Sequence, residues 1–204
     1  AERYGAMMMV DEAHATGVRG PNGAGVVAEL GLGAEIMVQM GTLGKALGAF
    51  GAYVAGTAEL KELLINRARS FIFTTALPPV VLAMASAAIK LVEKEQARQC
   101  ALQRNTEQLR KGLNKFGYSV GGGTQIIPVI VGNDQSCMQL AARLLESGIY
   151  VQGIRPPTVP VGTSRLRITT MATHTAKQMD RALEAFEHVK TTVPASSPKP
   201  GLKS

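Results

Sequence analysis

Apolar and polar residues along this chain follow a pattern that predicts alternating strands and helices. The first feature is a continuous apolar run at residues 5–10, typical of a strand buried on both faces of a parallel sheet. Strand-like runs follow at residues 35–39 and 51–55, and the short run Phe71-Ile72-Phe73 predicts another strand. Because a doubly buried strand needs neighbours and the first half offers few, we expect a piece of a larger α/β fold.

Helical periodicity fills the segments between and after these strands. Residues 26–30 predict a short helix, and Thr57 is placed to cap the N-terminus of the next one. A much longer helical stretch begins at Pro78-Pro79 and extends to about residue 117. Its first part is apolar, and it becomes charged near residues 93–96, which predicts a boundary between two domains.

The predicted domains occupy residues 1–95 and 96–190, and the Pro/Ser/Lys-rich tail at residues 191–204 is expected to be disordered. The second domain alternates between strands and helices. Strands are expected at residues 125–131, 149–154 and 165–170, and helices at residues 136–146 and 175–190. The last helix should bury one apolar face, made of Ala182, Leu183, Phe186 and Val189.

Composition and charge narrow the classes of partner. The net charge is +7, yet there is no block of Lys and Arg, aromatic residues make up only 4%, and there is no Trp. These features argue against nucleic-acid binding and fit small phosphorylated or acidic ligands. No apolar run reaches the roughly 18 residues of a membrane helix, so no membrane partner is expected.

The cysteines and the start of the chain bear on location. Cys100 and Cys137 make no disulfide framework, and both lie in helical patterns, so we expect small buried or half-buried thiols. No secretory or transit peptide is recognisable at the start, and a cytoplasmic location is expected.

Two polar segments follow predicted strands and are the chemically distinctive parts of the chain. One is Asp11-Glu12-Ala13-His14, and the other is a glycine-rich loop that holds Lys45. Lys45 is either a solvated loop lysine or part of a loop that holds an anion, with Thr42 adding a hydroxyl. A nucleotide-hydrolase loop is excluded by position, because Gln39 stands where its first glycine belongs and Ala46 follows the lysine.

Asp11 and Lys45 together match the needs of pyridoxal phosphate (PLP). This cofactor requires a lysine for its Schiff base, an acid at its pyridine nitrogen and donors for its phosphate. The separation is 45 − 11 = 34 residues, enough for a crossover helix and one more strand. Thr42 could then donate to the phosphate, and His14 either faces the ring or is satisfied by loop backbone.

Five ordered motifs resemble the α-oxoamine synthases, PLP enzymes of the type I fold that condense an amino acid with an acyl thioester and release CO₂. The motifs are residues 10–17 (VDEAHATG), 20–25 (GPNGAG), 41–48 (GTLGKALG), 70–79 (SFIFTTALPP) and 154–160 (IRPPTVP). The last resembles one branch, the 8-amino-7-oxononanoate synthases of biotin synthesis. The resemblance covers residues 4–190 and implies the C-terminal half of the fold, because members are about twice this long.

The resemblance implies a role for each matched residue. Lys45 would form the Schiff base, Asp11 would pair with the pyridine nitrogen, His14 would contact the phenolic oxygen and Thr42 would bind the phosphate. Thr74 and Thr75 would reach the phosphate in a neighbouring subunit, so a homodimer with a shared site is expected. Arg155 would bind the substrate carboxylate with help from Thr158, and no metal is implied.

The implied reaction is the condensation of L-alanine with a pimeloyl thioester, carried by CoA or an acyl carrier protein. Another α-oxoamine synthase, such as glycine C-acetyltransferase, is the alternative within the class. A third hypothesis is a catalytically incomplete folded half, because the missing N-terminal half would carry the residue that stacks on the ring.

Overall fold

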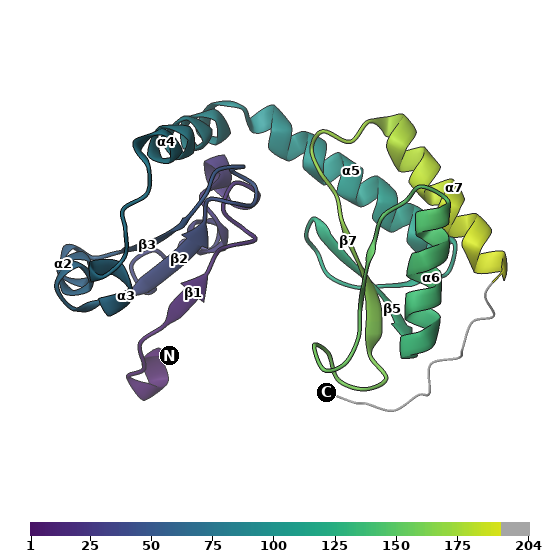
Figure 1. Cartoon of the computed structure of the whole chain (residues 1–204), viewed down its shortest axis with the longest axis horizontal. Coiled ribbons are helices and arrows are strands. Elements are labelled where there is room, and N and C mark those ends of the chain that lie inside the picture. The colour runs from purple at the N-terminus through teal and green to yellow at the C-terminus, as the bar shows by residue number, and fades with distance from the viewer. Residues whose placement is uncertain (193–204) are drawn as a thin grey trace. The chain divides into compact units, whose positions relative to one another are not determined.

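The computed structural model describes residues 1–192, and these divide into two compact units. The first unit is Ala1–Gln99 and the second is Cys100–Ser204, and each is described by itself (Figure 1). Of the predicted disordered tail, the part after Thr192 lies outside the described residues. None of the described helices is long and apolar enough to cross a membrane.

The first unit is a three-stranded sheet with helices around it. Its strands are β1 (Met9–Asp11), β2 (Val38–Thr42) and β3 (Ala52–Gly56), in the order β1-β2-β3. β1 runs parallel to β2, and β3 runs antiparallel to β2. The helices are η1 (Glu2–Tyr4), η2 (Pro21–Gly23), α1 (Val26–Glu29), α2 (Ala58–Arg67), α3 (Arg69–Ile72) and α4 (Pro79–Lys94).

Helix boundaries in this unit follow local signals. Thr57 caps α2 as predicted, because its side-chain oxygen accepts a hydrogen bond from the backbone N–H of Leu60 at 3.3 Å. The predicted long helix is two helices, since Glu95 leaves the helical conformation between α4 and α5 (Gln96–Lys115).

Three strand predictions in the first unit are wrong in position, extent or type. The strand predicted at residues 35–39 is β2, which lies at Val38–Thr42. The apolar run at residues 5–10 gives only a three-residue strand, and Met7 and Met9 are 79% and 59% exposed rather than buried. Strand side chains point to the two faces of a sheet, and among the described residues no element covers Met7 and Met9 there. Phe71 and Ile72 lie in α3 instead of a strand, and local bonds to the Ala68 carbonyl satisfy their backbone N–H groups.

The second unit is an antiparallel four-stranded sheet packed against helices (Figure 1). The strand order is β4-β5-β7-β6, with β4 (Ser119–Val120), β5 (Ile126–Gly132), β6 (Gln152–Ile154) and β7 (Ser164–Thr169). Its helices are α6 (Asp134–Glu146) and α7 (Ala176–Thr192), together with most of α5. The strand predicted at residues 149–154 is shorter than expected, and β4 was not predicted.

The core of the second unit is closed. Phe186, Leu113, Ile127, Leu144 and Leu166 are fully buried in one cluster. The prediction for α7 is confirmed for Ala182, Phe186 and Val189, which are buried, while Leu183 is partly buried against the same cluster. Cys137 is buried as expected, but Cys100 is exposed, because its position on α5 does not face this cluster.

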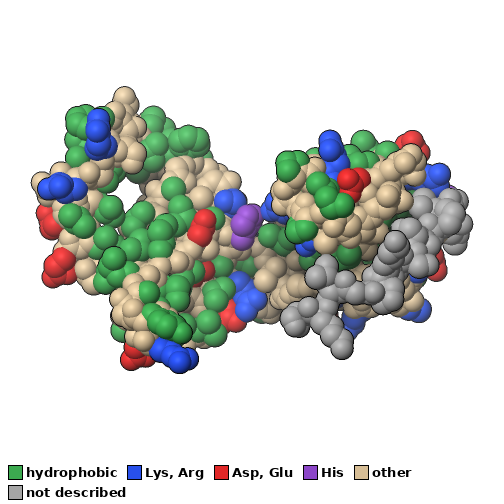
Figure 2. All heavy atoms as spheres, turned by 90° about the horizontal axis from the view of Figure 1, so that it is seen from below, with side chains coloured by type: hydrophobic (Ala, Val, Ile, Leu, Met, Phe, Trp, Pro, Cys, Tyr) green, Lys and Arg blue, Asp and Glu red, His purple; other side chains and the backbone are tan. Residues whose placement is uncertain are grey.

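The two units differ sharply in how well they enclose apolar side chains. Among the described residues, nineteen large hydrophobic side chains are exposed in the first unit and six in the second. Figure 2 shows hydrophobic side chains gathered on one face of the first unit. Since monomeric proteins rarely expose large continuous apolar surface, this unit has surface that more polypeptide could cover.

Candidate functional site

Two loops begin at the same edge of the first sheet. β1 and β2 are parallel, and Asp11 at the end of β1 is in register with Met40 of β2. β2 ends two residues later at Thr42, so both strands deliver their following loops to one edge. The carboxyl ends of parallel strands are where open α/β sheets place ligand chemistry.

The loop after β2 presents Lys45 beside a hydroxyl. The Lys45 amine donates a hydrogen bond to Thr42 Oγ1 at 3.2 Å. Leu43 and Leu47 on either side are buried against Ala85 of α4, which anchors the loop and leaves Lys45 exposed. The Leu43 N–H also donates to the Gly51 carbonyl at 2.9 Å. The loop therefore holds an amine and a hydroxyl together on an anchored backbone.

The loop after β1 starts with a turn at Asp11. Its Oδ1 accepts a hydrogen bond from the Ala13 backbone N–H at 2.8 Å, while the residue itself remains exposed. His14 follows on the exposed side of the same turn. The carboxylate thus lies at the strand end with one oxygen committed to the local turn.

Glu12 is the buried residue of this loop and was not singled out from the sequence. Its residue is only 3% exposed, and its carboxylate accepts the Val26 N–H at 3.0 Å and the Val27 N–H at 2.7 Å. These are the first N–H groups of α1, where a negative charge is favourable. A Cβ on Gly25 would lie 2.8 Å from the same carboxyl group, so the close approach depends on glycine there.

Tyr53 ties the third strand to the same loop. Its hydroxyl lies 2.8 Å from Thr16 Oγ1, and Thr16 donates in turn to the Glu12 carbonyl at 3.0 Å. Tyr53 is paired with Gly41 across β2 and β3, and a Cβ at Gly41 would lie 2.6 Å from the tyrosine oxygen. Gly41 thus lets the ring pass over β2. Tyr53 was not predicted, because the register that sets it opposite Gly41 cannot be read from the sequence.

The remaining predicted site residues lie elsewhere. Thr74 and Thr75 are exposed in the connection between α3 and α4 of the first unit. Arg155 and Thr158 are exposed directly after β6, in the second unit, where the Thr158 N–H donates to the Arg155 carbonyl at 3.1 Å. The structure thus brings Asp11, His14, Thr42 and Lys45 to one sheet edge and places the other four on separate segments.

No group of three or more His, Cys, Asp or Glu side chains in residues 1–192 could hold a metal ion. The side chains at the sheet edge supply an amine, a hydroxyl, a carboxylate and an imidazole.

Known proteins resemble the chain over almost its whole length. An 8-amino-7-oxononanoate synthase of Geobacter sulfurreducens is 53% identical over 190 residues, which are 92% of this chain and 49% of that relative. One from Anaeromyxobacter dehalogenans is 49% identical over 97% of this chain and 50% of its own length. The chain spans about half the length of these curated relatives.

The chain is also similar to several solved structures. A serine palmitoyltransferase of Sphingomonas wittichii matches with a TM-score of 0.89 and 34% identity, over 94% of this chain and 49% of that one. The 8-amino-7-oxononanoate synthase of Francisella tularensis matches with a TM-score of 0.80 and 30% identity, over 90% and 55%. A structure of SPT with a PLP internal aldimine also matches, with a TM-score of 0.89 and 33% identity.

These findings confirm the predicted α/β fold of PLP-dependent transferases and the resemblance to α-oxoamine synthases. The family model for aminotransferase class I and II matches residues 1–186. The chain therefore belongs to the aminotransferase class I and II family.

Proposed function

We propose that this chain is the lysine-bearing part of a PLP-dependent acyltransferase that makes 8-amino-7-oxononanoate in biotin synthesis. The substrates would be L-alanine and a pimeloyl thioester, carried by CoA or an acyl carrier protein. The observation that carries the proposal is the Lys45 amine, 3.2 Å from the Thr42 hydroxyl at the sheet edge where Asp11 ends the neighbouring strand. The names of the relatives supply the product, and the motif resemblance implies the substrates.

The residues at this edge fit PLP by the chemistry of their groups. Lys45 supplies the amine that the cofactor's aldehyde requires, and Thr42 supplies a hydroxyl for its phosphate. Asp11 supplies a carboxylate for the pyridine nitrogen, and His14 supplies an imidazole for the phenolic oxygen. When bound, PLP acts as an electron sink for a carbanion at the amino-acid α-carbon.

The side chains of this chain would then bind substrate and move protons. The Lys45 amine would take the α-proton of alanine as a general base. Asp11 would hold the proton on the ring nitrogen. Arg155 would bind the substrate carboxylate through its planar guanidinium, assisted by Thr158.

Other parts of the proposal concern assembly and organisation. Thr74 and Thr75 would reach the phosphate of a second subunit, which makes the working enzyme a homodimer with shared sites. The first unit would be part of the large cofactor-binding domain, and the second unit the small C-terminal domain. The protein would work in the cytoplasm.

Trapping the lysine adduct tests the proposal. The chain is incubated with stoichiometric PLP, reduced with borohydride and digested, and the pyridoxyl-lysine peptide is identified by mass spectrometry. We expect the label on Lys45 and its loss in Lys45→Ala, with Lys61→Ala as control because Lys61 is an exposed lysine on α2. A label that persists at the same yield in Lys45→Ala would contradict the assignment.

The alternative is a different α-oxoamine synthase activity in place of the one proposed. It is favoured by the match to a serine palmitoyltransferase at a TM-score of 0.89. Turnover of alanine with a pimeloyl thioester, compared with glycine and acetyl-CoA or serine and palmitoyl-CoA, separates these activities. A catalytically silent half is not favoured, because the similarity to synthases extends over 92% of the chain.

A further inference from the structure

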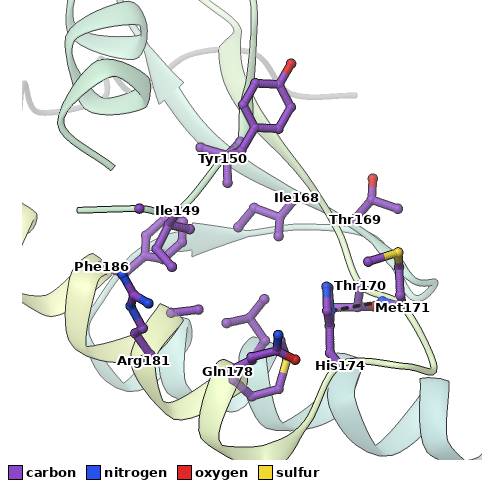
Figure 3. A pocket seen from close by; sticks show the side chains of 15 residues that line it. Ile149, Tyr150, Ile168, Thr169, Thr170, Met171, His174, Gln178, Arg181 and Phe186 are labelled. Atoms are coloured by element: carbon purple, nitrogen blue, oxygen red, sulfur yellow. Dashed lines mark hydrogen bonds between the residues drawn. The ribbon is translucent and has the colours of Figure 1, made fainter. Parts of the chain in front are cut away.

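The second unit contains a hollow that the proposed reaction does not use. It has a volume of about 430 Å³ and lies between the start of α7, the end of β7 and residues 148–151 (Figure 3). Its lining is largely apolar: exposed Met171 and half-buried Ile149 contribute surface above a floor of Ile168, Met179 and Ala182, which are 4–7% exposed. This volume is within the range of about 300–1,000 Å³ that small-molecule sites occupy.

The polar groups around this floor are hydrogen-bond donors. His174 accepts the Met171 N–H on Nδ1 at 3.2 Å, so its Nε2 carries a proton. Gln178 uses its Oε1 to accept the Thr175 N–H at 2.9 Å, so its NH₂ group is the part left to donate. Arg181 is exposed, and its Nη2 donates to the Ser147 carbonyl at a long 3.4 Å.

Groups that could repel an anion are absent from the lining. None of the fifteen lining residues, all in the described part of the chain, is Asp or Glu. Tyr150 points away from the hollow in Figure 3, and its hydroxyl donates to Gln152 Oε1 at 3.0 Å. Asp180, beside Arg181 in sequence, is not part of the lining and accepts a hydrogen bond from Gln108 at 2.8 Å.

We propose that this hollow binds a medium-chain carboxylic acid. The hydrocarbon chain would cover the apolar floor and remove apolar surface from water. The carboxylate would lie at Arg181 and Gln178, where a charge-assisted bond is strongest. An apolar floor with a rim of donors selects a ligand that is apolar at one end and anionic at the other. The site shares no residue with the loops of the first unit and goes beyond the proposed function.

Binding of octanoate to the complete 204-residue chain tests the proposal. Calorimetry gives the affinity, and amide chemical shifts locate the site. We expect saturable octanoate binding with shifts at residues 148–151 and 174–182. Octanol, which keeps the chain and lacks the charge, and acetate, which keeps the charge and lacks the chain, should each bind at least about tenfold more weakly.

Arg181→Gln removes the charge at an exposed position and should weaken octanoate binding about tenfold or more, as expected for a lost charged hydrogen bond. Arg104→Gln is the matched control, because Arg104 is exposed on α5 and does not line the hollow. Circular dichroism checks that both variants fold. Arg181→Glu should abolish binding by repulsion.

Four results would overturn the proposal. Octanol binding as tightly as octanoate would leave only an apolar surface. Inorganic phosphate that displaces octanoate at equal concentration would leave only an anion site. Equal octanoate affinities in Arg181→Gln and Arg104→Gln would show that Arg181 does not bind the carboxylate. Octanoate binding that does not saturate at millimolar concentration would show that the hollow is not a binding site. Each of these results leaves the Lys45 proposal untouched, because the trapping experiment reads out a different unit.

Discussion

Glu12→Gln should loosen the loop that follows β1. The native carboxylate accepts two backbone N–H groups, from Val26 at 3.0 Å and Val27 at 2.7 Å, at a position only 3% exposed. A carboxamide of the same shape has one acceptor oxygen, and its NH₂ group would face the other N–H. One buried donor then loses its partner, which costs about 1–3 kcal/mol.

A cost of about 2 kcal/mol corresponds to roughly a 30-fold change in an equilibrium constant. We therefore expect the Val26 and Val27 amides to exchange with solvent about 30-fold faster in Glu12→Gln, measured by native-state hydrogen exchange. Glu12→Ala removes both acceptors and should increase the effect further. The matched control is Glu35→Gln, because Glu35 is an exposed carboxylate between α1 and β2 that makes no side-chain hydrogen bond or ion pair to the described residues.

Val26 and Val27 exchange rates within twofold of wild type in Glu12→Gln would show that the carboxylate does not hold the loop. An equal acceleration in Glu35→Gln would show that α1 opens by fraying, independently of Glu12. Because the same loop carries Asp11 and His14, a confirmed effect should also weaken PLP retention, measured by equilibrium dialysis.

Two further predictions concern the second unit. Burial raises the pKa of Tyr118 to about 12 from an unfolded value of 10.0, so its stabilising contribution is complete below pH 10 and is lost as pH rises through 12. The midpoint of urea unfolding should fall less between pH 9 and 12 in Tyr118→Phe than in the wild-type chain. Midpoints that fall equally with pH in both proteins would contradict this prediction. Burial also raises the pKa of Cys137, so a thiol reagent should label exposed Cys100 first and Cys137 only after unfolding. Equal labelling rates of Cys100 and Cys137 in the native protein would refute this prediction.

Elements with a complete local signal were predicted well. The Thr57 cap, the two-residue alternation of β7 and the apolar face of α7 each reside in a few neighbouring residues. Phe71-Ile72-Phe73 has strand-forming composition, but a strand requires a distant partner, and local helical bonds formed instead. Burial of the run at residues 5–10 was wrongly predicted for the same reason, because burial depends on distant segments that cover the sheet, and Met7 and Met9 are exposed among the described residues.

The candidate site also combines features that the sequence predicted with features that depend on distant contacts. The spacing of Asp11 and Lys45 predicted two strands ending near each other, and β1 and β2 are parallel neighbours. No spacing rule indicates that Glu12 reaches forward to the amide of Val26, because the loop between them has glycines that allow many paths. Tyr53 was hidden for a related reason, since its partner Thr16 lies on another segment, 37 residues away.

The two units enclose their apolar side chains to different extents, so we expect them to differ in solubility when each is expressed alone. A gene segment that starts before α5 would encode a self-sufficient module, because the cluster around Phe186 draws on α5 to α7 and the β4–β7 sheet alone. The first unit expressed separately would need detergent, a fusion tag or a chaperone to remain dispersed, with side chains such as Phe73 78% exposed. The junction before α5 is therefore the natural place to divide the chain for crystallography or labelling.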